Sequence, residues 1–169
     1  MKVAVLVENK YQVLEVWYPY LRLWEEGIKT VLVGTGQHLY QSKEGYPAQE
    51  ELPVKKADPK KFDGVIIPGG YAPDYLRRHA EINRFVKNIF ASGKLVAAIC
   101  HGGWVLVSAG ILKNRKATSF MAIKDDMVNA GVQYLDQEVV VDKNLITSRN
   151  PYDLPAFCRE IIIFLKTKK

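Results

Sequence analysis

The sequence has few cysteines and no long apolar segment. Two cysteines among 169 residues are too few for the disulfide framework of a small secreted domain. The apolar run that follows Met1 and Lys2 is too short for a signal peptide, and no run reaches the roughly 20 residues that a membrane span requires. We therefore expect a cytoplasmic protein in a reducing compartment, without membrane association.

The sequence also lacks the patterns that bind metals, dinucleotides or nucleic acids. Its three histidines and two cysteines show no zinc-ligand spacing, so we expect no metal. Gly34-Thr35-Gly36 lacks the third spaced glycine of a dinucleotide-binding loop, so we expect no cofactor. The net charge of +6 is spread in short clusters, which favours a solvated basic surface over a specific nucleic-acid site.

What is present is the alternation of apolar runs and amphipathic segments that is typical of an α/β fold. Continuous apolar runs predict strands buried on both faces, at 3–7, 30–34, 64–67 and 95–99. Amphipathic segments predict helices at 13–26, 80–92, 123–130 and from 151 onward. Weaker patterns predict a loop or hairpin at 37–57, a short strand at 116–119 and a hairpin at 138–148. We expect one domain, 1–169, with a mostly parallel sheet and helices on both faces.

Two of the predicted helices have an apolar stripe that we assign to the core. In the helix at 13–26 the predicted stripe consists of Val13, Trp17, Tyr20, Leu21 and Trp24. In the last helix it consists of Leu154, Phe157, Cys158, Ile161, Ile162 and Leu165. We therefore interpret Cys158 as a core residue without chemistry of its own.

The other cysteine lies where a strand turns into a helix. Ala98-Ile99-Cys100-His101-Gly102 joins the apolar run 95–99 to a helical pattern, with no room for a loop. Small residues two places before and after the central residue are the signature of a nucleophile elbow. Cys100 is therefore predicted to be a nucleophile at the N-terminus of a helix, where partial positive charge favours a thiolate.

Three neighbouring groups are candidates to assist this thiol. The His101 amide is free to face a developing oxyanion, and Gly69-Gly70 exposes further amides at the end of another strand. Glu15 is either a buried carboxyl that shares a proton with the thiol, with a raised pKa, or a solvated carboxylate of the first helical turn. Asp74 either orients the His101 ring or merely stabilises a turn.

These motifs together resemble the DJ-1/PfpI superfamily, and specifically its PfpI-type members. The resemblance extends over essentially the whole chain. It is carried by Pro68-Gly69-Gly70, Ala72-Pro73-Asp74-Tyr75-Leu76-Arg77, Ala98-Ile99-Cys100-His101-Gly102, Lys124-Asp125-Asp126-Met127 and Thr147-Ser148-Arg149. It implies a flavodoxin-like three-layer sandwich with Cys100 on the elbow.

The resemblance also implies the roles of the site residues. Glu15 would lie beside the thiol, and the amides of Gly70 and His101 would form the oxyanion hole. His101 would pair with an acid at the Asp74 position of a neighbouring subunit, in a homo-oligomer of dimers that often form hexameric rings.

Three functions are open at this stage. The first is a cofactor-free glyoxalase or deglycase that acts on small carbonyl compounds or on glycated protein or nucleotide amines. The second is an intracellular cysteine peptidase with a Cys100–His101–Asp74 triad across a subunit interface. The third is a redox-sensing stress or chaperone protein without turnover.

Two local departures from the family pattern bear on that choice. Gln12 stands where many relatives carry an acid, which changes the charge beside the thiol. Gly103-Trp104 follows the elbow where relatives have Pro-Gln, and the Trp104 ring is expected to narrow or cover the pocket.

Overall fold

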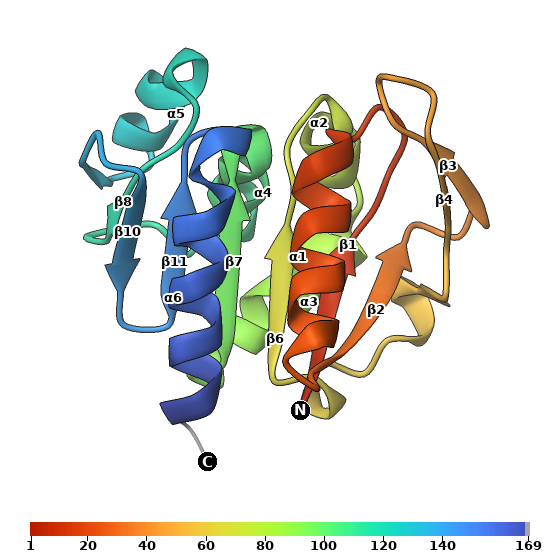
Figure 1. The fold of residues 1–169 in the computed structure, drawn as a ribbon. Coiled ribbons are helices and arrows are strands. Elements are labelled where there is room, and N and C mark those ends of the chain that lie inside the picture. The colour runs from red at the N-terminus through yellow and green to blue at the C-terminus, as the bar shows by residue number, and fades with distance from the viewer. Residues whose placement is uncertain (168–169) are drawn as a thin grey trace.

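A seven-stranded sheet forms the centre of the computed structural model, which describes residues 1–167 (Figure 1). In spatial order its strands are β10 (Val139–Asp142), β11 (Leu145–Ser148), β7 (Leu95–Ile99), β6 (Gly64–Ile67), β1 (Lys2–Leu6), β2 (Lys29–Gly34) and β5 (Leu52–Pro53). Within this sheet, β10 and β11 pair antiparallel and every other neighbouring pair is parallel. The predicted mostly parallel sheet and the hairpin at 138–148 are confirmed.

Helices cover both faces of the sheet and complete a three-layer sandwich. Helices α1 (Val13–Glu25) and α6 (Leu154–Thr167) lie side by side on the face toward the viewer in Figure 1, and α3 (Ala80–Ala91) and α4 (Gly103–Ala109) lie behind it. Two shorter helices are α2 (Ala72–Leu76) and α5 (Lys124–Asn129). Every residue of β6 and β7 is buried, which explains why these strands are continuous apolar runs in the sequence.

Two small strand pairs lie outside the main sheet. Strands β3 (Leu39–Gln41) and β4 (Pro47–Gln49) form an antiparallel hairpin within the segment 37–57, as predicted. The predicted strand at 116–119 is only partly right. Strand β8 (Lys116–Ala117) is shorter and pairs with β9 (Gln133–Tyr134) instead of joining the main sheet.

The predicted stripe of α1 is partly right. Val13, Trp17 and Tyr20 are partly buried against the core, but the other two residues of the stripe are not. Leu21 and Trp24 are 53% and 63% exposed, whereas Leu23 is fully buried. The buried face instead contains Glu15, Val16, Pro19 and Leu23. With aromatic and aliphatic residues around most of this helix, hydrophobicity alone does not identify the inward face. The predicted stripe of α6 is confirmed, and Cys158 is 1% exposed within it.

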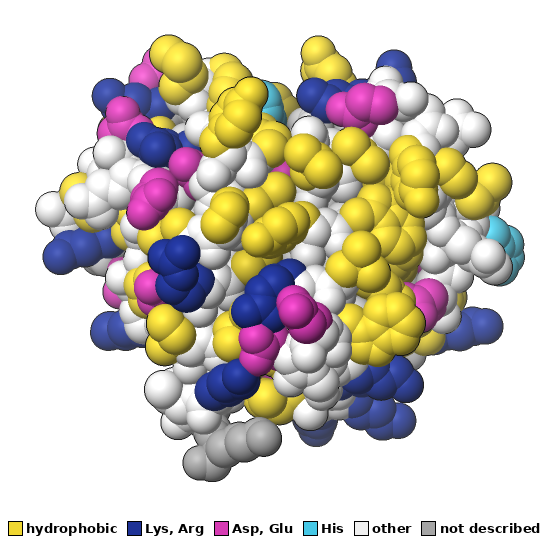
Figure 2. Space-filling view, in the orientation of Figure 1, with side chains coloured by type: hydrophobic (Ala, Val, Ile, Leu, Met, Phe, Trp, Pro, Cys, Tyr) yellow, Lys and Arg dark blue, Asp and Glu magenta, His cyan; other side chains and the backbone are white. Residues whose placement is uncertain are grey.

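The outward face of α1 leaves apolar side chains on the surface. Figure 2 shows them gathered over the front of the molecule, where α1 and α6 lie. They include Leu14, Tyr18, Leu21, Trp24 and, from α6, Ile163. Exposed apolar patches often mark protein interfaces, but the homo-oligomer stays a prediction. None of the helices in residues 1–167 has the length and apolar character that crossing a bilayer would need.

The orientation of α1 can be tested with two leucines of the same helix. Leu23→Ala removes a fully buried side chain and is expected to lower the free energy of unfolding by about 2–5 kcal/mol. Leu21→Ala trims a side chain that is 53% exposed and is expected to change it by less than about 1 kcal/mol. Urea denaturation measures both. Equal losses, or a larger loss for Leu21→Ala, would contradict the observed orientation.

Candidate active site

The functional candidates meet at the carboxyl edge of the three central strands. Strands β1, β6 and β7 are neighbours and run parallel, so the segments that follow them emerge side by side. A pocket of about 240 Å³ opens there. Its walls are formed by Gln12, Glu15, Lys43, Gly70, Tyr71, Cys100, His101, Phe120, Asn150 and Pro151.

Cys100 lies on a sharp turn between β7 and α4. A single 3₁₀ turn, Cys100–Gly102, joins the two elements, and the φ angle of Cys100 is +60°. This left-handed conformation costs a residue with a side chain roughly 1–3 kcal/mol and is common where function requires it. A Cβ atom on Gly102 would lie 2.5 Å from the Ile67 carbonyl oxygen. The predicted elbow is confirmed, and so is its need for a small residue at this position.

Two kinds of hydrogen-bonding group lie beside the Cys100 sulfur. The Nδ1 atom of His101 lies 3.2 Å from Sγ. The backbone amides of Gly70 and His101 both donate toward the sulfur and favour its charged form. The geometry thus brings together the amides predicted to form an oxyanion hole.

Glu15 is buried at the base of the pocket, and the alternative of a solvated carboxylate is wrong. Its side chain is fully covered, and Oε2 accepts a hydrogen bond of 2.7 Å from the Gly69 amide. Oε1 is also buried and has no hydrogen-bond partner among the described residues. Burial raises the pKa of Glu15 from 4.5 to about 7, against the lowering effect of the Gly69 amide. The direction of this shift is the one predicted for a buried carboxyl.

The predicted low pKa of the Cys100 thiol is not found. Burial raises the pKa of Cys100 to about 12, and the charge of Glu15 acts in the same direction. The amides at the helix start lower it, as predicted, but they are outweighed. The second cause disappears when Glu15 is protonated. A neutral carboxyl therefore makes the thiolate less unfavourable, although burial still raises the pKa of Cys100.

His101 is held between two aromatic rings. Phe120 stacks on the imidazole with ring centres 5.0 Å apart, and Trp104 meets it edge-on at 5.1 Å. Burial, assisted by the charge of Lys43, lowers the pKa of His101, so the ring is neutral at neutral pH. Trp104 donates a hydrogen bond of 2.7 Å to Asp126 and does not line the pocket. It supports His101 rather than covering the thiol, contrary to our expectation.

Asp74 does not contact His101 within one chain. It lies in α2, and its half-exposed carboxylate pairs with Arg78 one turn further on. A pairing between His101 and Asp74 of a neighbouring subunit stays a prediction.

Gln12 contributes to the position of Glu15. Its side chain accepts a hydrogen bond of 3.0 Å from the Glu15 amide and so caps the start of α1. The residue that departs from the family pattern is thus a polar helix cap in the pocket wall.

Sequence reasoning missed Lys43, Phe120 and Asn150. Lys43 follows β3, and its amide donates to the Tyr11 carbonyl at 3.0 Å, which brings its loop to the pocket. Its charge lowers the pKa values of both Glu15 and His101. No local pattern could have identified these residues, because only tertiary contacts place them at the site. No group of three or more His, Cys, Asp or Glu residues within 1–167 is arranged to hold a metal ion.

Comparison with known proteins identifies close relatives. Residues 1–163 match the DJ-1/PfpI family. Deglycase PfpI of Pyrococcus furiosus is 42% identical over 166 residues, covering 98% of this chain and 100% of that protein. Deglycase PH1704 of Pyrococcus horikoshii is 43% identical with the same coverage. A Bacillus subtilis protein named "Putative cysteine protease YraA" is 37% identical, covering 98% of each chain.

Solved structures support the same architecture. A two-domain protein of Anabaena variabilis, with DJ-1/ThiJ/PfpI-like and ferritin-like domains, has a TM-score of 0.96 and 42% identity. The match covers 98% of this chain and 48% of that one, so this chain spans about half its length. Schizosaccharomyces pombe DJ-1 has a TM-score of 0.89 at 24% identity, covering 96% of this chain and 90% of that one, and is similar in fold.

The raised pKa of Glu15 predicts a pH-dependent stability. Because folding raises this pKa from 4.5 to about 7, the folded state holds a proton that the unfolded state loses. The free energy of unfolding should therefore fall as pH rises from 5 to 8, by about 2.5 kcal/mol from this group. Glu15→Gln should remove that fall. Urea denaturation at the two pH values, on both proteins, measures the difference.

The difference between the two profiles isolates Glu15 from His101. The lowered pKa of His101 acts oppositely, since its contribution to stability is lost as the pH falls, and it is common to both proteins. Glu138→Gln, at an exposed glutamate, serves as the control and should keep the wild-type profile. A Glu15→Gln profile that parallels the wild-type one would contradict the raised pKa.

Proposed function

This chain belongs to the DJ-1/PfpI family, and we propose that it is an enzyme whose Cys100 thiolate attacks reactive carbonyl compounds or the adducts they form with amines. The deglycase names of its Pyrococcus relatives support this assignment. The observation that supports this proposal most strongly is the composition of one small pocket. It brings together Cys100, His101, Glu15 and two backbone amides.

The first step is addition of sulfur to an aldehyde carbon. Cys100 gives its proton to Glu15 or to His101, and Sγ forms a bond to the carbon. The electron pair of the C=O bond moves to oxygen, where the Gly70 and His101 amides donate hydrogen bonds to the alkoxide. That oxygen then takes up a proton, which gives a hemithioacetal.

The later steps need no cofactor. For a free 2-oxoaldehyde, a proton leaves the carbon bound to sulfur and a proton is added to the neighbouring carbonyl carbon. The hydroxyl proton of the hemithioacetal passes to the oxygen of that neighbouring carbon, which gives the thioester of a 2-hydroxy acid. Water then cleaves the C–S bond and restores the thiol, so the net change is the addition of one water. For an adduct on an amine, whose reacting carbon carries a hydroxyl group and the nitrogen, Sγ forms a bond to that carbon as the C–N bond breaks. The thiol proton leaves with the amine, and the same hemithioacetal remains on Cys100.

The proton carriers suit neutral pH. The pKa of Glu15, about 7, lets this carboxyl both accept and return a proton. The lowered pKa of His101 keeps its ring neutral and able to accept one. Because the pKa of Cys100 is raised to about 12, the thiolate forms as one of these bases takes its proton.

The pocket itself favours small substrates. With a volume of about 240 Å³ it is smaller than most sites for drug-sized ligands. Cys100 is 8% exposed at its base. A small dicarbonyl, or the glycated end of an amine, suits this space better than a folded polypeptide.

A cysteine peptidase is the second candidate. The distance of 3.2 Å between Cys100 Sγ and His101 Nδ1 favours it, because that pair is what such a peptidase needs. It also needs an acid to orient His101, and in one chain Asp74 pairs with Arg78 instead. The activity would thus depend on a homo-oligomer that supplies Asp74 from a neighbouring subunit, so we place it second.

The redox-sensor alternative has less support. Low exposure and a raised pKa both slow oxidation of a thiol, and Cys100 has both. The proposed enzyme is placed in the cytoplasm, where reducing conditions keep this thiol free.

The two cysteines provide a matched test of the proposed activity. Cys100→Ser is expected to lower the rate of methylglyoxal consumption by roughly 10³-fold or more, because the attacking thiolate is lost. Cys158→Ala, in the core of α6, should keep the rate of the folded protein within roughly twofold. Lactate formation measures turnover, and circular dichroism verifies folding. A Cys100→Ser protein as active as the wild type would rule out the proposed mechanism.

A further inference from the structure

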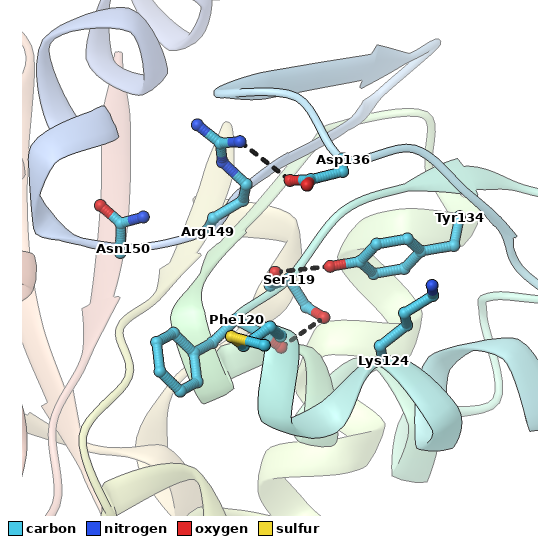
Figure 3. Close-up of a pocket in the computed structure, with 8 residues that line it drawn as sticks. Ser119, Phe120, Lys124, Tyr134, Asp136, Arg149 and Asn150 are labelled. Carbon is cyan, nitrogen blue, oxygen red and sulfur yellow. Dashed lines mark hydrogen bonds and ion pairs between the residues drawn. The ribbon is translucent and has the colours of Figure 1, made fainter.

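A second hollow, of about 540 Å³, adjoins the thiol pocket. Phe120 and Asn150 line both, so the two spaces share a wall. Figure 3 shows Lys124, Tyr134, Asp136, Arg149 and Asn150 arranged around it. The proposed chemistry at Cys100 makes no use of this space, although it is the larger of the two.

Arg149 is fixed in the hollow by one buried and one exposed carboxylate. Its Nε and Nη2 atoms donate to Asp153 at 3.0 and 3.2 Å, and the Asp153 side chain is only 7% exposed. Its Nη1 atom donates to Asp136 at 2.8 Å, where the Asp136 side chain is 78% exposed. Asp153 therefore sets the orientation of the guanidinium. The exposed Asp136 pair contributes little stability and can exchange its partner at small cost.

Two further hydrogen-bond donors in the hollow have no acceptor. The Lys124 ammonium lies over the Tyr134 ring, 5.5 Å from its centre, and no carboxylate of residues 1–167 is within ion-pairing distance. Asn150 uses its Oδ1 atom to accept from the Tyr152 amide at 3.0 Å. Its Nδ2 group has no partner in the described part of the chain. The hollow thus presents hydrogen-bond donors from Lys124, Arg149 and Asn150. Of the two carboxylates that bind Arg149, only Asp136 is exposed to solvent.

We propose that this hollow binds an anionic group, a carboxylate or a phosphate, carried by the amine half of the substrate adduct. The inference rests on the proposed function, since the carbonyl half of the same molecule occupies the thiol pocket. An anion at Lys124 takes the place of Asp136 on Arg149, where the Nη1 group donates a charge-assisted hydrogen bond to it. Asn150, in the shared wall, lies between the two halves of the substrate.

Lys124 and Asp136 should act with opposite signs on anionic substrates. Lys124→Gln removes an attractive charge and should lower kcat/KM for anionic substrates. Asp136→Asn removes the carboxylate that competes for Arg149 and should raise kcat/KM for the same substrates. A purely structural role would make both substitutions harmful, or neutral, for all substrates alike.

The experiment compares adducts that differ by one negative charge. The probes are methylglyoxal adducts of N-acetylarginine and of its uncharged amide, and of guanosine 5′-monophosphate and guanosine. Chromatography measures release of the free compound, and the readout is the ratio of kcat/KM for the anionic and the neutral member of each pair. The matched control is Lys87→Gln, at an exposed lysine of α3 that lines neither of the two pockets.

We expect the wild type to prefer the anionic member by roughly two- to fivefold, the effect of one favourable exposed ion pair. Lys124→Gln should bring the ratio toward one, with the neutral substrate unaffected. Asp136→Asn should raise the ratio, and Lys87→Gln should leave it unchanged. A preference confined to the arginine pair identifies a carboxylate as the ligand, and one confined to the guanosine pair identifies a phosphate.

The result that overturns the inference is distinct from failure of the proposed function. A wild-type ratio near one, or ratios that Lys124→Gln and Asp136→Asn both leave unchanged, overturns the anion site while Cys100-dependent turnover persists. Turnover that survives Cys100→Ser overturns the function itself. Each variant has its own expected direction of change in the ratio, so either one tests the inference if the other folds poorly.

Discussion

The sharp turn at Cys100 is the constraint on which the site depends. Strand β7 passes into α4 through three residues, and the chain makes this turn only with Cys100 at a φ of +60°. Contact between Gly102 and the Ile67 carbonyl, and a hydrogen bond of 3.2 Å from the Phe120 amide to the Cys100 carbonyl, hold the turn. A relaxed turn would move the sulfur away from Glu15 and from the oxyanion amides together.

Burial explains the protonation of the site more than any single charge does. It raises the pKa values of Glu15 and Cys100 and lowers that of His101. Each shift favours the neutral form of its group, so Cys100 and His101 are uncharged at neutral pH, and Glu15, with a pKa of about 7, is partly protonated. The amides of Gly70 and His101 are already oriented toward the charge that develops when the thiol loses its proton.

The sequence predicts the parts of this site that follow from local geometry, and it misses those that depend on burial or on distant loops. The elbow at Cys100 follows from small residues at fixed spacing between a strand and a helix. The raised pKa of Cys100 does not follow from the sequence, because a position at the start of a helix predicts a lowered thiol pKa. Lys43 reaches the pocket through a backbone contact with Tyr11 that no pattern encodes. Leu21 and Trp24 of α1 were wrongly assigned to the core because apolar residues surround most of that helix.

The two ends of the main sheet bear on how the protein behaves at high concentration. At one end, β5 is two residues long and includes Pro53, which has no amide hydrogen to offer another strand. At the other end, β10 lies beside β8, and the Asp142 side chain accepts a hydrogen bond from the Lys116 backbone amide. Neither border is a free template for strand addition, so runaway cross-β aggregation from the native state is disfavoured. Any contact between copies of this chain would therefore use helices and loops, which keeps the sheet finite.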